Sequence, residues 1–66
     1  MRITVHCKGL SKDDVTYLKT IRAGSARITV LTDGEEANIN AIGSFDDLVK
    51  IITQVTCLKN YEVHLH

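Results

Sequence analysis

The sequence predicts a single α+β domain whose strands and helices follow one another in the order βαββαβ. Four segments alternate polar and apolar side chains with the period of a half-buried strand. Two other segments repeat apolar residues at spacings of three and four, and each follows a serine that is suited to cap a helix. The 66 residues allow one domain, residues 1–66, with a small core.

The first strand and the first helix are predicted from the amino-terminal third of the chain. Residues 2–7 alternate polar and apolar side chains, which is typical of a strand with one buried face. Ser11 and Asp14 then have the spacing of a capping box, with Asp in place of the usual Glu or Gln. We therefore expect a helix over residues 12–23, with Gly24 as the residue just beyond its end.

A hairpin is predicted next. Residues 26–31 alternate again, and residues 35–42 resume an extended pattern. Between the two segments lies Asp33-Gly34, a dipeptide that strongly favours a tight turn.

A second helix and a final strand complete the prediction. Ser44 and Asp47 repeat the serine and aspartate spacing of the first helix cap. Apolar residues follow on one helical face, so we expect a helix over residues 45–56. Residues 61–66 alternate up to the end of the chain and form the fourth predicted strand.

The two halves of the chain are similar to each other, since residues 9–15 parallel residues 43–48 between a strand and a helix. Two such strand-helix-strand units pack most simply as a two-layer sandwich, with a four-stranded antiparallel sheet and both helices on one face. This arrangement resembles the ferredoxin-like split βαβ fold. In such a sheet the first and fourth strands are antiparallel neighbours.

An alternative strand order comes from a second resemblance. The chain resembles the histidine-containing phosphocarrier (HPr) of sugar transport at Gly9-Leu10 and, loosely, at residues 40–43. The Gly-Leu-His-Ala-Arg-Pro motif of that family is replaced here by residues 9–14, Gly-Leu-Ser-Lys-Asp-Asp, so the phosphorylated His, the Arg and the Pro are missing. The resemblance therefore offers a phosphocarrier-like strand order but no phosphocarrier activity.

Composition excludes several classes of function. Eight Lys and Arg balance eight Asp and Glu, so no net positive field attracts nucleic acid or an anionic membrane. The chain holds only two Tyr and one Phe, which is too few for an aromatic stacking platform, and nucleic-acid binding is not expected. No apolar run is long enough to span a membrane, and no signal peptide follows Met1, so we expect a cytoplasmic protein.

Enzyme chemistry is not expected either. The sequence has no phosphate-binding loop, and no Ser or Cys lies in a recognisable motif with a His and an acid. The paired acids Asp13-Asp14 and Asp46-Asp47 lie in the first turns of the helices, where the helix dipole favours negative charge. Cys7 shares the apolar side of its strand and is interpreted as a structural thiol. We predict no catalytic residues and no cofactor.

The strand face that the helices leave uncovered is the predicted binding surface. Strand alternation assigns the following partner-binding residues to it: Arg2, Thr4, Arg27, Thr29, Leu31, Asn38, Asn40 and Glu62. The leading hypothesis is a small intracellular interaction or regulatory protein, such as an adaptor or inhibitor, that binds a protein partner through this face or through an edge strand. A homodimer is also an option, because a core this small often needs a second subunit.

The alternative hypothesis is a metal-binding domain. All three histidines of the chain, His6, His64 and His66, have the parity of the uncovered face, and Glu62 shares it. Imidazoles with a carboxylate suit zinc, copper or nickel. The interpretation without a metal site is that these are solvated polar residues of an exposed sheet face.

Overall fold

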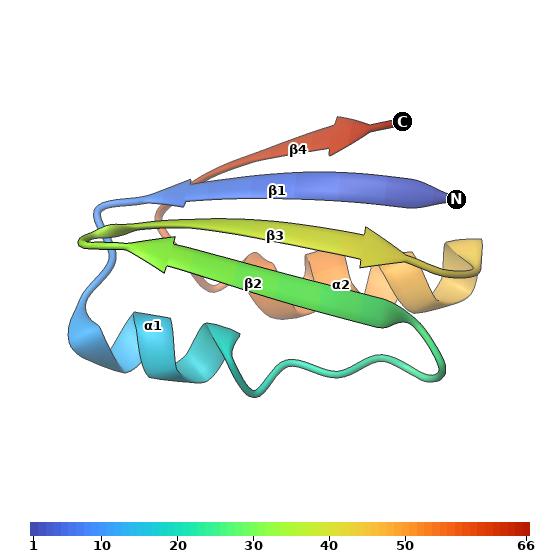
Figure 1. The fold of residues 1–66 in the computed structure, drawn as a ribbon, viewed down its shortest axis with the longest axis horizontal. Helices are drawn as coiled ribbons and strands as arrows, with labels where there is room; N and C mark the ends of the chain where they lie inside the picture. The colour runs from blue at the N-terminus through green and yellow to red at the C-terminus, as the bar shows by residue number, and fades with distance from the viewer.

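The computed structural model describes all residues 1–66 and consists of a four-stranded antiparallel sheet with two helices packed on one face (Figure 1). The elements in chain order are β1 (Arg2–Lys8), α1 (Lys12–Leu18), β2 (Arg27–Asp33), β3 (Glu36–Ile42), α2 (Phe45–Val55) and β4 (Asn60–Leu65). The predicted α+β class and the βαββαβ order are confirmed. Neither helix has the length and hydrophobicity needed to cross a lipid bilayer.

The strands lie in the order β2-β3-β1-β4, so β1 and β3 are central and β2 and β4 form the two edges. As expected, β1 and β4 are antiparallel neighbours, with Val5 opposite Val63 and His6 opposite Glu62. The register of β1 with β3 places Val5 opposite Ile39. Because residues directly opposite one another share a face, the register divides the sheet into a helix-covered face and an outer face.

The core lies between the sheet and the two helices. It contains no buried polar or charged residue, and the sheet contributes alternate residues from its two central strands. The helices contribute four of the buried side chains: Leu18, Leu48, Ile51 and Val55. Cys7 is fully buried in this core, as predicted, and burial raises the pKa of its thiol above the ordinary value of 9.0.

The first helix is shorter than the sequence predicts: it ends at Leu18, and the expected helix over residues 12–23 is wrong in its second half. The capping box at its start is formed as predicted, with Ser11 Oγ accepting from Asp14 N at 3.2 Å. Beyond the helix, Ile21 and Ala23 are both buried while the residue between them is exposed. An extended chain buries alternate residues, whereas a helix would turn them to nearly opposite sides. Tertiary burial therefore outweighs the helical pattern here.

Gly24 is consequently not the residue that ends the helix. It instead lets the loop before β2 approach Asp47 closely. Its φ of +51° is in the left-handed region, and a Cβ built on it would overlap with the carboxylate of Asp47. The backbone N–H of Ser25 donates to the same carboxylate at 3.4 Å. The loop before β2 is thereby packed against the first turn of α2.

The second helix matches its predicted range to within one residue, but its cap differs from the first. Ser44 Oγ accepts from Asp47 N at 3.3 Å, as a capping serine does. The Asp47 carboxylate does not complete a capping box, because it faces the loop at Gly24 and Ser25 instead. The two similar sequence segments thus use their aspartates differently.

The hairpin between β2 and β3 forms at the predicted position. Asp33 and Glu36 are the last paired residues, which leaves Gly34 and Glu35 as the loop. Gly34 has a φ of +61°, a left-handed value that glycine adopts without steric cost.

Candidate functional site

The outer face of the sheet is formed by all four strands, and no helix covers it (Figure 1). The cross-strand register places every predicted partner-binding residue on this face, in three rows that run across the strands. The first row is Arg27, Ile42 and Arg2; the second is Thr29, Asn40, Thr4 and His64; the third is Leu31, Asn38, His6 and Glu62.

The first row combines two positive charges with an exposed apolar side chain. Ile42 lies between Arg27 on β2 and Arg2 on β1, and 52% of its surface is exposed. The ion pairs of the structure involve only histidines and acids, so neither guanidinium is engaged in one. The chain is fixed at this end, because Met1 and Gly43 exchange two hydrogen bonds of 3.0 and 3.1 Å.

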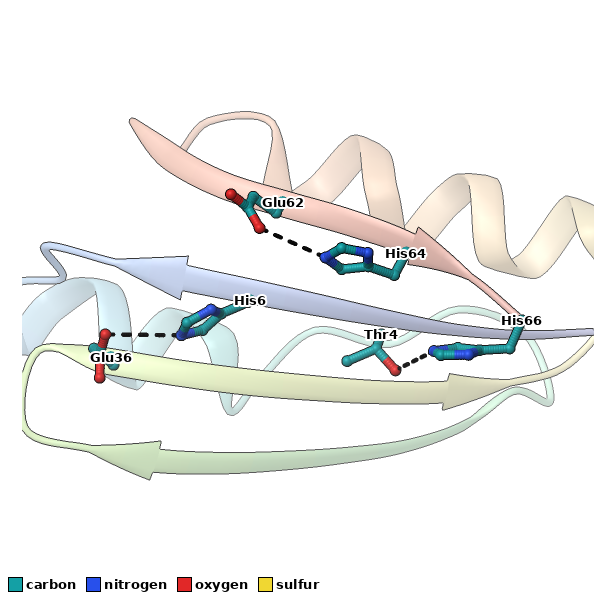
Figure 2. Close-up of polar contacts among 6 residues, drawn as sticks. All are labelled: Thr4, His6, Glu36, Glu62, His64 and His66. Atoms are coloured by element: carbon teal, nitrogen blue, oxygen red, sulfur yellow. Dashed lines mark hydrogen bonds and ion pairs between the residues drawn. The ribbon is translucent and has the colours of Figure 1, made fainter.

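The second row is polar and uncharged at its centre. Thr4 Oγ1 donates to Asn40 Oδ1 at 3.1 Å, which uses the single proton of the hydroxyl. The ring nitrogen Nε2 of His66 lies 2.9 Å from Thr4 Oγ1 (Figure 2). Because the hydroxyl proton is already used, the imidazole is the donor in this contact. The network fixes the C-terminal histidine over β1.

The three histidines lie on the outer face, as predicted, but each has a different partner (Figure 2). His6 Nε2 is 3.8 Å from Glu36 Oε1, and His64 Nε2 is 3.5 Å from Glu62 Oε2. No group of three or more His, Cys, Asp or Glu side chains is gathered closely enough to hold a metal ion. The arrangement therefore brings His6, His64 and His66 onto one surface without assembling them into one set of ligands.

A shallow hollow lies where β1 and β4 meet the loop before β4. It is lined by His6, Lys8, Lys59, Asn60, Tyr61 and Glu62. Lys8 and Lys59 contribute two amines to its lining and Glu62 one carboxylate, so the hollow offers hydrogen-bond donors at the edge of the outer face.

The helix-covered side of β4 carries a second surface, which sequence reasoning missed. Tyr61 and Leu65 have the parity of the core, yet both are exposed, Leu65 by 69%. On α2, Phe45 and Val49 are also exposed, Phe45 by 63%. We call these four side chains the β4 apolar strip. The signal was the i, i+4 spacing of Phe45 and Val49, two apolar residues of the predicted helix that lie outside its core face of Leu48, Ile51, Ile52 and Val55.

Helical periodicity places the α2 part of this strip next to β4. Asp47 and Gln54 point to the α1 side of α2, where the side chain of Gln54 donates to the Arg22 carbonyl at 2.8 Å. Phe45 and Val49 lie on the opposite side of the helix, beyond the residues that contact the sheet. The edge strand on that side is β4.

Comparison of the chain with protein-family models, with curated proteins and with solved structures finds no match in any of the three.

Proposed function

We propose that the chain is a small interaction module of the ferredoxin-like type, which binds a protein partner through the outer face of its sheet and acts as an adaptor, inhibitor or other regulator. The strand order β2-β3-β1-β4, with both helices on one face, supports the ferredoxin-like arrangement over the phosphocarrier-like alternative. Function does not follow from this arrangement, so the proposal depends on the surface itself.

The row of Arg27, Ile42 and Arg2 carries the proposal. Two guanidinium groups without ionic partners flank an exposed isoleucine on the outer face of the sheet. Arginine is enriched at protein interfaces because its planar group binds carboxylates through two hydrogen bonds. An apolar side chain between two such groups suits a partner surface that presents acidic groups around an apolar residue.

The second and third rows of the outer face determine how a partner is oriented when it docks. The middle row contains neutral polar groups, and the third row has exposed Leu31 at one end and Glu62 at the other. Positive charge in the first row and negative charge in the third give the face a direction, which fixes how a complementary partner docks.

The experiment uses a variant that changes the face without changing net charge. Thr29→Glu with Asn40→Arg places opposite charges on directly paired residues of β2 and β3, an arrangement that sheets tolerate. Thr16→Arg with Thr53→Glu is the matched control, since both residues are exposed on the helices. Proteins captured from the native cell extract are identified, and their affinity for each purified variant is measured by isothermal titration calorimetry.

We expect the sheet-face variant to lose binding while the helix variant retains it. A second variant, Arg2→Glu with Arg27→Glu, should weaken binding by about tenfold or more if the first row contacts acidic groups. Unchanged affinity in the Thr29→Glu, Asn40→Arg variant, with circular dichroism confirming the fold, would exclude the outer face as the binding surface.

A further inference from the structure

We infer that β4 is a self-association edge, at which a second copy of this chain pairs antiparallel with β4 about a two-fold axis at Val63 and joins the two sheets into one. This edge borders the outer face and shares Glu62 and His64 with it, but the inference does not depend on the proposed function. It is carried by the free edge of β4, by the complementarity of its sequence with itself, and by the β4 apolar strip beside it.

The backbone of β4 has a free hydrogen-bonding edge. His66 N donates to Arg2 O at 3.0 Å, so the N–H of His66 points toward β1. Backbone groups of successive strand residues point in alternate directions, so those of Tyr61, Val63 and Leu65 point away from β1, where no further strand lies. The β1–β4 register runs without a bulge, and β4 contains no Pro or Lys, so three of the usual protections of an edge strand are missing.

Only certain alignments of the residues let β4 of one copy pair with β4 of a second copy. The outward-pointing residues must face one another, and facing residues share a side of the sheet. Val63 opposite Val63 of the second copy meets both conditions and places the helices of both copies on the same side. Tyr61 then faces Leu65 of the second copy, so every outward N–H and C=O in these three residues has a partner.

Charge selects this register among the allowed ones. With Val63 on the axis, the carboxylate of Glu62 lies opposite His64 of the second copy, and the reverse pair forms symmetrically. A shift by two residues in one direction would place Glu62 opposite itself, and a shift in the other direction would place His64 opposite itself. The imidazole of His64 can donate a hydrogen bond to a carboxylate placed opposite it, whereas two carboxylates placed opposite each other repel. Figure 2 shows Glu62 and His64 side by side on β4, already oriented toward one another.

The apolar strip indicates what the pairing buries. Four of the eight exposed large hydrophobic side chains of the chain belong to it: Phe45, Val49, Tyr61 and Leu65. With the helices of both copies on one side, the two strips adjoin across the axis, and each covers the other. Removal of such apolar area from water is the main driving force of association.

The other edge is less suited to the same contact. On β2, Arg27 would face Asp33 of a second copy, which is also complementary. The surface beside that edge, however, is lined by Lys19 and Arg22. Pairing of β2 with itself would bring these cations of the two copies together, which costs free energy, and the helix-side residues Ile28 and Val30 are already partly buried. Use of one edge alone gives a closed dimer instead of a fibre.

A charge exchange tests the inference by sedimentation velocity and native mass spectrometry of the full chain. The wild type should give a concentration-dependent species of twice 7.3 kDa. Glu62→Lys places a cation opposite His64, and His64→Glu places two carboxylates opposite each other. The dissociation constant of each variant alone should therefore rise by about tenfold or more. An equimolar mixture of Glu62→Lys and His64→Glu should restore a heterodimer, because both cross-strand pairs are then complementary.

The control is Asp33→Lys, which makes the same charge change on the outer face of β2 and should leave dimerisation unchanged. Circular dichroism of every variant confirms that the monomer is folded. A wild type that stays monomeric up to millimolar concentration overturns the inference. So does a dimer that Asp33→Lys disrupts and Glu62→Lys does not, or a mixture of the two β4 variants that fails to associate.

Discussion

Replacement of Gly24 by alanine tests the contact between the loop before β2 and the first turn of α2. The new Cβ would lie 2.7 Å from Cγ of Asp47, closer than any carbon contact in a well-packed core. At a φ of +51° the alanine also adopts the left-handed conformation, which costs about 1–2 kcal/mol. Because the clash is with the end of a side chain that can rotate away, the added cost is the hydrogen bond that Ser25 N donates to Asp47, about 0.5–1.5 kcal/mol.

Gly34 provides the matched control for this substitution. Its φ of +61° is similar, but a Cβ there has no atom within 4 Å. Gly34→Ala should therefore cost only the conformational term of about 1–2 kcal/mol. The entropy that alanine removes from the unfolded chain is common to both substitutions and cancels in the comparison.

Asp47→Ala completes a double-mutant cycle. It removes the group that the new Cβ meets, so Gly24→Ala in the Asp47→Ala background should fall to the cost of Gly34→Ala. The expected coupling between the two positions is about 0.5–1.5 kcal/mol. If Gly24 merely followed the end of α1, as the sequence suggests, the two substitutions would be additive.

Urea unfolding followed by far-ultraviolet circular dichroism measures these free energies. A chain of 66 residues has a stability of about 3–10 kcal/mol, so the single variants remain measurable. Equal costs for Gly24→Ala and Gly34→Ala, or strictly additive effects in the double variant, would refute the proposed contact.

Three further predictions concern the core, the buried thiol and the histidines. Ile51→Ala should lower the free energy of unfolding by about 2–5 kcal/mol because the side chain is fully buried, whereas Thr29→Ala on the outer face should cost less than about 1 kcal/mol; a thermally silent Ile51→Ala would contradict the position of α2. Burial raises the pKa of the Cys7 thiol, so the unfolded chain ionises first and stability should fall as pH rises above 9.0. Cys7→Ala should make this fall with pH less steep, and an identical slope in both proteins would assign it to other groups, such as Tyr17, whose pKa is also raised. If zinc binds in one-to-one stoichiometry, His64→Gln with His66→Gln should abolish the binding in a calorimetric titration, and an unchanged affinity would end the hypothesis of a histidine site.

Local chemistry was sufficient to predict most element positions. The Ser11 and Asp14 capping box forms as read from the sequence, because both partners lie within one turn. The alternation of the strands also predicted which residues share the outer face, since a strand has only two sides. Arg2, Thr29 and Glu62 lie there for that reason.

Sequence parity could not predict which neighbours the outer-face residues contact. His6 lies beside Glu36, a residue of β3, and His66 contacts Thr4 instead of the other histidines. These pairs depend on the strand order and the register, which involve residues far apart in the chain. The sequence therefore predicted a common surface for the three histidines but not their separate partners.

By itself, then, the sequence determined the βαββαβ order, the serine N-caps of both helices and the two sides of each strand, because propensity, capping and alternation act over a few residues. Only the tertiary structure decided that Ile21 and Ala23 leave the helix to enter the core, and that Asp47 faces Gly24. It alone decided that β4 is an edge whose core-parity side chains Tyr61 and Leu65 remain exposed. Burial depends on which elements cover a face, and that coverage is a property of the packed molecule as a whole.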